Sequence, residues 1–240
     1  MEIEILISTF GNGIEKIKLP NNESFIKYLI IHQNYYGFEV PKQLIRKDVR
    51  VIQSKSKGLS KSRNIAIRHS TSDLIMIMDD DVAISTDKIY NALTVIQNFN
   101  FANVYTLIHH SKVQGQIKKF KKRLTYFFHN QFSLSSVSSI DIVMNASFLK
   151  KTGIVFDEDF GLGSPTPTGE EYIFLCDLLK ETKILNIPIS VGVHDGLSSG
   201  HRNKYTKKFF TDKKRVFIRN FGLVGYLIFF LFFINSLRKR

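Results

Sequence analysis

The stretch Leu74-Ile-Met-Ile-Met-Asp79-Asp80-Asp81 is the part of the sequence that decides the fold prediction. Five apolar residues in a row are typical of a short strand that is buried on both faces of a sheet. Three carboxylates follow directly, and open α/β sheets bind ligands in the crevice beyond the carboxyl ends of their strands. The stretch therefore predicts an α/β protein with an acidic site at one edge of its sheet.

The three adjacent carboxylates need either a nearby cation or full exposure to water, because like charges side by side repel. Carboxylate oxygens are suitable ligands for Mg²⁺ or Mn²⁺, so one hypothesis is a metal site that grips a phosphate group. The alternative is a solvated acidic turn before the next helix, since Ser85-Thr-Asp87 has the composition of a helix cap. The triplet alone is compatible with both.

Strands and helices alternate along the rest of the chain. We expect strands at residues 2–10, 28–32, 48–53, 74–78, 102–108, 140–146 and 184–193, and helices after Gly58 and at residues 87–99 and 170–180. A loop must cover residues 161–169, because its two prolines and three glycines oppose regular structure. This order, in a chain of 240 residues, predicts a single α/β domain with a mostly parallel central sheet flanked by helices.

The net charge of +13 is concentrated in two parts of the chain. Residues 202–240 hold eleven Lys or Arg and one acid, which accounts for +10 of the charge, and a second basic cluster lies at residues 118–123. Within the basic C-terminal part, the fourteen residues 221–234 carry no charge, and they are fewer than the ~20 that a membrane-spanning helix needs.

An apolar segment between basic clusters favours a helix that lies on an anionic membrane surface or inserts shallowly into it. The alternative is a C-terminal helix packed on the domain or on a second subunit. We expect no nucleic-acid partner. A basic nucleic-acid-binding arm must stay in contact with water, and an uncharged apolar segment such as residues 221–234 would not.

Glu170 and Glu171 follow the loop at residues 161–169 directly. A carboxylate held there over a site could serve as a general base. The alternative is structural, because Thr168-Gly-Glu-Glu171 has the spacing of a capping box and acids are favoured in the first turn of a helix.

Arg63 and His194 are further candidates. Arg63 stands at the start of the helix that follows Gly58, where it would suit a phosphate or nucleotide, or pair with a nearby acid. His194 ends the last predicted strand and could complete a metal shell beside the aspartates. A lone histidine at a strand end is more often a surface or hydrogen-bonded residue, so both roles stay open.

Taken in order, these motifs resemble those of the family-2 glycosyltransferases, which have the A-type nucleotide-sugar fold. That family shows a first extended strand, a Gly-x-x-x-x-Arg-Asn helix start, a buried strand ending in Asp-x-Asp, a Phe-Asp-x-x-Phe-Gly segment, a Gly-Glu-Asp/Glu site and a downstream histidine. The matching positions here are Leu6–Thr9, Gly58–Asn64, Asp79–Asp81, Phe156–Gly161, Gly169–Glu171 and His194. The resemblance covers about residues 2–201.

The resemblance implies a role for each acid of the triplet. Asp79 would face the nucleotide ribose and the metal, and Asp81 would bind Mn²⁺ or Mg²⁺ directly. Asp80, between them, belongs with the nucleotide-binding residues, and His194 matches the position that supplies a further metal ligand in some relatives.

The resemblance also implies a catalytic base. Glu171 matches its position, which is usually an aspartate in the family, and the adjacent Glu170 is a rival for the role. Thr9 and Arg63 would border the nucleotide. Gln33 stands where the family often has acids that read the base, and its amide could hydrogen-bond a uracil, so UDP is favoured.

The function that the resemblance implies is a metal-dependent, inverting glycosyltransferase. It would move a sugar from a nucleotide-diphosphate donor, with a UDP-sugar favoured, to a hydroxyl of a glycan or a polyprenyl-pyrophosphate-linked acceptor in envelope polysaccharide synthesis. Residues 1–205 would form the catalytic domain, and residues 206–240 would associate with an anionic membrane surface at the cytoplasmic, inner face of the cell membrane. The alternatives are a nucleotidyltransferase and a non-catalytic membrane or nucleic-acid binding protein.

Overall fold

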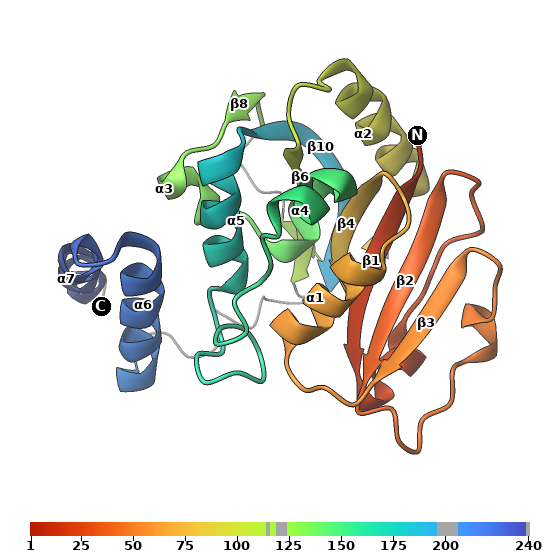
Figure 1. Cartoon of the computed structure of the whole chain (residues 1–240), viewed down its shortest axis with the longest axis horizontal. Helices are drawn as coiled ribbons and strands as arrows, with labels where there is room; N and C mark the ends of the chain where they lie inside the picture. The colour runs from red at the N-terminus through yellow and green to blue at the C-terminus, as the bar shows by residue number, and fades with distance from the viewer. Residues whose placement is uncertain (114–115, 119–123, 196–205, 239–240) are drawn as a thin grey trace.

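A large twisted sheet forms the centre of the computed structural model, which describes residues 1–113, 116–118, 124–195 and 206–238 (Figure 1). The order of its main strands is β3-β2-β1-β4-β9-β6-β10-β5, with β7 paired to β6 and β8 to β10. The strands are β1 (Ile3–Phe10), β2 (Ile26–Gln33), β3 (Val49–Ser54), β4 (Leu74–Asp79), β5 (Val82–Ile84), β6 (Val104–Val113), β7 (Gln116–Lys118), β8 (Phe127–Phe128), β9 (Ile142–Asn145) and β10 (Ile184–Asp195).

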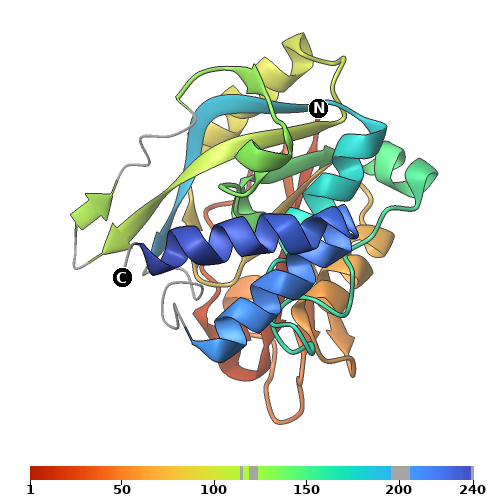
Figure 2. The same cartoon turned by 90° about the vertical axis from the view of Figure 1, so that its left-hand side faces the viewer.

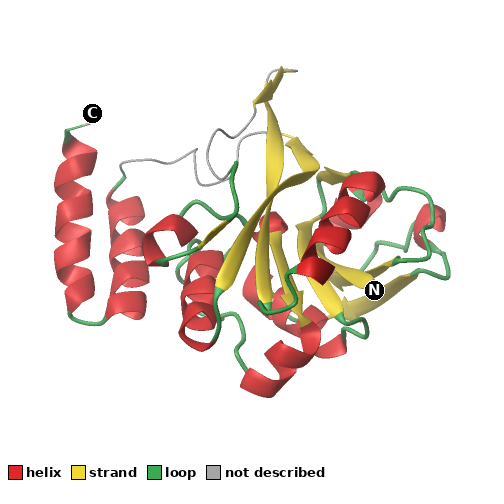
Figure 3. Ribbon diagram, turned by 90° about the horizontal axis from the view of Figure 1, so that it is seen from above, coloured by secondary structure: helices red, strands yellow, loops and turns green. Residues whose placement is uncertain are grey.

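Helices cover both faces of this sheet, and two further helices project from one side of it (Figures 1 and 3). The helices are α1 (Leu59–His69), α2 (Thr86–Asn98), α3 (Gln131–Leu134), α4 (Ala146–Thr152), α5 (Glu170–Glu181), α6 (Lys207–Phe221) and α7 (Val224–Leu237), with short 3-10 turns η1 (Gly11–Lys16), η2 (Lys42–Leu44) and η3 (Ser139–Asp141). The predicted α/β class with a central sheet between helices is confirmed.

The sheet is parallel in its first half and mixed in its second half. β1, β2, β3 and β4 pair in parallel, whereas β9 is antiparallel to both β4 and β6. Between β6 and β9, which are antiparallel neighbours, the chain passes through β7, β8, α3 and η3. β6 and β10 also pair in parallel, so the sheet departs from the expected parallel arrangement only at the short strands β5, β7, β8 and β9.

The strand predicted at residues 140–146 is shorter in the structure, where β9 ends at Asn145. The side chain of Asn145 accepts a hydrogen bond of 3.0 Å from the backbone N–H of Phe148 and so caps α4. A helix cap at the end of β9 explains why the extended structure stops there.

Burial of β4 on both faces is confirmed by the packing of its alternate residues. Met76 and Met78 belong to the hydrophobic cluster that includes α2, whereas Ile75 and Ile77 belong to the cluster that includes α1 and α5. Because side chains cover both faces of β4, packing fixes the position of the strand. Its last residue, Asp79, lies at the edge of the sheet.

The two C-terminal helices form an antiparallel hairpin (Figure 2). Phenylalanine rings fill its interface, with Phe210 and Phe233 4.8 Å apart and Phe217 and Phe232 5.6 Å apart between centroids. Gly225 allows the helices to approach closely, since a Cβ there would lie 2.4 Å from the carbonyl oxygen of Phe217. Among the described residues, no helix combines the length and apolarity needed to cross a membrane.

Candidate active site

The three aspartates lie at the turn that joins β4 to β5, at the carboxyl end of the parallel strands. Thr9, at the end of the neighbouring β1, donates a hydrogen bond of 2.6 Å from Oγ1 to Oδ2 of Asp80. Burial raises the pKa of Asp80 above its usual range, although the bond from Thr9 opposes this, and the charges of Asp81 and Asp79 add to it. The predicted acidic site at the edge of the sheet is thus present.

Arg63 connects this acidic turn to α5. Its guanidinium is only 2% exposed and lies 5.4 Å from the centroid of the Phe156 ring. Nη2 donates to Oδ1 of Asp79 and Nη1 donates to Oε1 of Glu170, both at 3.2 Å. Because Glu170 is buried as well, the guanidinium compensates its charge in a place with little water, whereas Asp79 is 35% exposed and stays partly hydrated. The alternative that Arg63 pairs with acids is therefore realised in this structure.

Glu171 stands beside that ion-pair network at the first turn of α5. Its side chain is partly buried, and burial raises its pKa to about 8; the charge of Glu170 adds to the shift and that of Arg63 opposes it. A carboxyl group with this pKa is suited to exchange protons near neutral pH. We call Asp79, Asp80, Asp81, Glu170 and Glu171 together the acidic site.

The capping-box alternative for these glutamates is wrong. The N-cap of α5 is Gly169, with φ +87°, and no side chain caps the helix. Glu170 turns to Arg63 instead of to the backbone of the N-cap. A glycine in the left-handed region has no side chain to cap with, so the first turn is left without the reciprocal bonds that a capping box needs.

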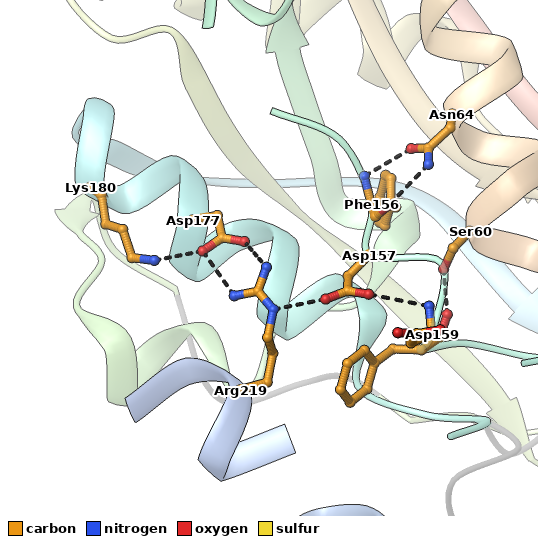
Figure 4. A network of polar contacts seen from close by, with 9 residues as sticks. Ser60, Asn64, Phe156, Asp157, Asp159, Asp177, Lys180 and Arg219 are labelled. Carbon is orange, nitrogen blue, oxygen red and sulfur yellow. Dashed lines mark hydrogen bonds and ion pairs between the residues drawn. The ribbon is translucent and has the colours of Figure 1, made fainter. Parts of the chain in front are cut away.

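Asn64 and Ser60 of α1 fix the segment that leads to α5 (Figure 4). Asn64 accepts from the backbone N–H of Phe156 at 2.8 Å and donates to the carbonyl of the same residue at 2.9 Å. Ser60 donates to the carbonyl of Phe160 at 2.6 Å. Arg63 and Asn64 thus have separate roles. Arg63 forms ion pairs with Asp79 and Glu170, and Asn64 hydrogen-bonds the segment that leads to α5. Sequence spacing does not reveal the role of Asn64, because its partner lies 92 residues away.

Helix α6 packs on the same loop, which the sequence does not predict. Arg219 pairs with Asp157 at 2.7 Å and with Asp177 at 2.8 Å (Figure 4). Val216 is buried against Gly169, where a Cβ would lie 2.5 Å from Val216 Cγ2. These contacts join residues far apart in sequence, and the basic composition of the segment suggests only a charged surface.

Gln33 is buried at the end of β2, next to the start of α1. Its Nε2 donates to Oγ of Ser56 at 2.8 Å and to the carbonyl of Gly58 at 3.2 Å. Since that carbonyl can only accept, the amide nitrogen must face it, and Oε1 points elsewhere. Within the described part of the chain, Oε1 has no hydrogen-bond donor.

His194 lies next to the acidic turn along the backbone, since it pairs with Val82, the residue after Asp81, in the β5–β10 ladder. Its side chain lies outside the described residues. The residues that are described hold no group of three or more His, Cys, Asp or Glu side chains arranged for a metal ion. Mg²⁺ is commonly held by only one or two carboxylates together with substrate phosphates, and Asp79 and Asp81 offer such a donor set.

Replacing Gly169 by Ala should destabilise the protein more than replacing Gly153, which has a similar φ of +68° but no atom within 4 Å of the place that a Cβ would occupy. Gly153→Ala tests backbone strain alone and should cost about 1 kcal/mol. Gly169→Ala adds a clash with Val216, worth roughly a further 1–3 kcal/mol. Chemical denaturation of both variants measures the difference; equal losses would mean that Val216 does not press on Gly169.

Comparison with known proteins agrees with this geometry. Residues 39–152 match the family described as glycosyl transferase family 2. The structure is similar to S. aureus TarS in complex with UDP-GlcNAc, with a TM-score of 0.66, 14% identity and coverage of 91% of this chain and 66% of that chain. It is also similar to S. aureus TarS in complex with UDP, with a TM-score of 0.64, 14% identity and coverage of 91% and 65%.

The chain thus spans slightly less than two thirds of the length of these TarS structures. No curated protein matches it. The family match falls on the region that carries the Arg-Asn helix start and the acidic turn, and the shared fold extends over nearly the whole chain. Residues 39–152 thus resemble glycosyl transferase family 2, and the fold of the chain resembles that of TarS.

Proposed function

We propose that the chain transfers a sugar from a UDP-sugar to an acceptor hydroxyl, with inversion at the anomeric carbon and with help from Mn²⁺ or Mg²⁺. The observation that carries the proposal is the Arg63 bridge, which brings the start of α5 to the acidic turn. A carboxyl of raised pKa therefore stands beside the acids that suit a metal and a diphosphate. The two solved structures with UDP-GlcNAc and UDP support a nucleotide-sugar donor.

Gln33 is the proposed reader of the donor base. Its Oε1 has no described donor and would accept a hydrogen bond from the uracil imide, while its fixed amide nitrogen keeps that oxygen in place. Thr9 and Asp80, which are already bonded to each other, would line the nucleotide on the β1 side.

Asp79 and Asp81 would hold the metal, and His194 is the proposed third ligand, from β10. When bound, a divalent ion supplies neutralisation of charge on the departing diphosphate. Arg63 keeps Asp79 oriented through its 3.2 Å contact, and so it acts as a positioning residue for that ligand.

Glu171 is the proposed base, since Glu170 is occupied by Arg63. It would take the proton from the acceptor hydroxyl, which then attacks the anomeric carbon opposite to the leaving group. One base and a single displacement give inversion, as in inverting glycosidases, where water is the nucleophile.

Titration with UDP tests the donor proposal. UDP should bind the parent protein more tightly with Mn²⁺ than without it, and more tightly than CDP or GDP. Gln33→Leu should lose part of this preference for UDP, because a buried polar contact that recognises the base is gone. Isothermal titration calorimetry measures each affinity. If none of the three nucleotides binds under either condition, the proposed donor class is wrong.

The exposed side of α7 supports a peripheral membrane location. Six apolar or aromatic side chains, each 49–87% exposed, lie on one side of the helix; this α7 face consists of Leu223, Val224, Tyr226, Leu227, Phe230 and Leu231. Lys214 of α6 lies beside this face, with its Nζ 5.0 Å from the ring centroid of Tyr226, and a cation next to an apolar face suits an anionic lipid surface. We propose that the protein rests on the inner face of the cell membrane and serves an acceptor of envelope polysaccharide synthesis there.

Leu227→Ser combined with Phe230→Ser should abolish sedimentation with anionic phosphatidylglycerol vesicles, because both side chains are more than half exposed and their loss leaves the core intact. The same variant should bind UDP like the parent. Such a surface change is preferable to removing residues 206–240, since α6 packs on the loop before α5. Vesicle sedimentation equal to that of the parent would rule out the α7 face as the membrane contact.

A further inference from the structure

The direction of α6 brings its N-terminal half to the acidic site. Val216 contacts Gly169 at the start of α5, whereas Arg219, further along α6, reaches Asp177, which lies further along α5. The two helices therefore run in the same direction, as Figure 1 also shows. Residues one turn before Val216 consequently lie near the N-terminal end of α5. Glu170 and Glu171 are in the first turn of that helix.

Lys213 is the cation in that position, on the same side of α6 as Val216. Its side chain is partly buried, and its Nζ lies 5.8 Å from the centroid of the Phe209 ring. Burial lowers the pKa of Lys213, while the nearby charges of Glu171 and Glu170 oppose that shift. The lysine is thus within electrostatic range of the proposed base.

Lys213 makes no salt bridge with any residue that the structure describes, although Lys208 on the same helix pairs with Asp212 at 3.4 Å. Arg63, the other cation of the site, is already shared between Asp79 and Glu170. A partly buried ammonium that forms no salt bridge with the described residues is suited to bind an anionic group of a substrate.

The neighbouring Lys214 points in another direction, since its Nζ lies 5.0 Å from the ring centroid of Tyr226, which belongs to the α7 face. The two adjacent lysines therefore lie on different surfaces. Lys214 lies over the apolar α7 face, and Lys213 lies beside the acidic site. An amphiphile whose chain lay against the α7 face would place its polar head near Lys213.

We propose that Lys213 binds a phosphate group of a lipid-linked acceptor, whose apolar chain lies along the α7 face and whose sugar hydroxyl reaches Glu171. This inference rests on the proposed function and adds to it the residue that recognises the phosphate of the acceptor. The donor diphosphate is the other source of phosphate, but the acids proposed for it lie on the β4 side of the site.

Calorimetric titration with geranyl phosphate and with geraniol, in an uncharged detergent, tests the proposal. Lys213→Met should weaken the binding of geranyl phosphate by roughly tenfold or more, because one charged hydrogen bond is lost. Geraniol, which lacks the phosphate, should bind the variant and the parent equally. Lys213→Arg should recover most of the affinity, and the control Lys208→Met, whose ammonium pairs with Asp212 in the parent, should bind like the parent.

Equal affinity of the parent and Lys213→Met for geranyl phosphate would overturn the proposal, provided that thermal unfolding shows both to be folded. A loss of UDP affinity alone would also overturn it, because Lys213 would then serve the donor. A parent that binds geranyl phosphate through Lys213 but binds no UDP would refute the proposed donor and leave this acceptor site standing.

Discussion

Glu171→Gln should lower kcat by roughly 10²- to 10⁴-fold and leave the affinity for UDP nearly unchanged, because the variant loses the proposed base. Glutamine keeps the size of the side chain, and Arg63 continues to hold Glu170 in place. Transfer from a radiolabelled UDP-sugar gives kcat, and calorimetry gives the UDP affinity. A nucleotidyltransferase would not need this residue, so full activity of the variant would favour that class.

The matched control is Glu170→Gln, which keeps the base but removes one carboxylate from Arg63. Its kcat should fall much less than that of Glu171→Gln. If Glu170→Gln instead gives the larger loss, the two glutamates exchange roles.

The pH dependence follows from the same residue. Because Glu171 has a pKa of about 8 in the free protein, kcat/KM should rise with pH up to about 8 and then level off. The folded protein also binds this proton more tightly than an unfolded chain with a pKa of 4.5, so the free energy of unfolding should fall as pH rises from 4.5 to about 8. Glu171→Gln should lack this part of the fall.

Arg63→Met should give a large loss of stability. It leaves the carboxylate of Glu170, 7% exposed, without its cation, and it also releases Asp79, which is 35% exposed. Breaking a buried ion pair from one side costs roughly 3–5 kcal/mol. We expect the lower end, about 3 kcal/mol, because Asp79 remains partly hydrated, and this corresponds to a fall in Tm of roughly 10 °C.

Arg63→Lys is the informative control for that prediction. A lysine keeps the charge but presents a single ammonium, so it cannot donate along two separate arms to Asp79 and Glu170. We expect an intermediate Tm and a weaker, metal-dependent affinity for UDP. A Tm of Arg63→Met within about 1 °C of the parent would show that the bridge contributes little to folding.

The sequence predicts the fold well because local signals and burial agree. The run before Asp79 is apolar at every position, and the structure buries its alternate residues in two different clusters. The mixed half of the sheet is harder to predict, since β9 is short and its end is set by the Asn145 cap of α4. Such a cap competes with strand propensity over a single residue.

The site is predicted less completely than the fold. The motifs name Asp79, Arg63 and Glu170, and the structure brings these three side chains together through two contacts of 3.2 Å. The contribution of α6 could not be predicted, because Val216 and Lys213 lie in a segment whose composition indicates only a basic amphipathic helix. Contacts between residues distant in sequence leave no local periodic signal.

Gly225 sets the tilt at which the proposed bilayer contact would hold the enzyme. Its missing side chain lets α7 lie close to the backbone of α6, and α6 in turn contacts α5, which carries the proposed base, through Arg219 and Val216. A displacement of α7 would therefore be passed through α6 to the proposed base. The side chain of Gly225, a single hydrogen atom, thus helps to set the distance between the proposed membrane contact and the proposed base.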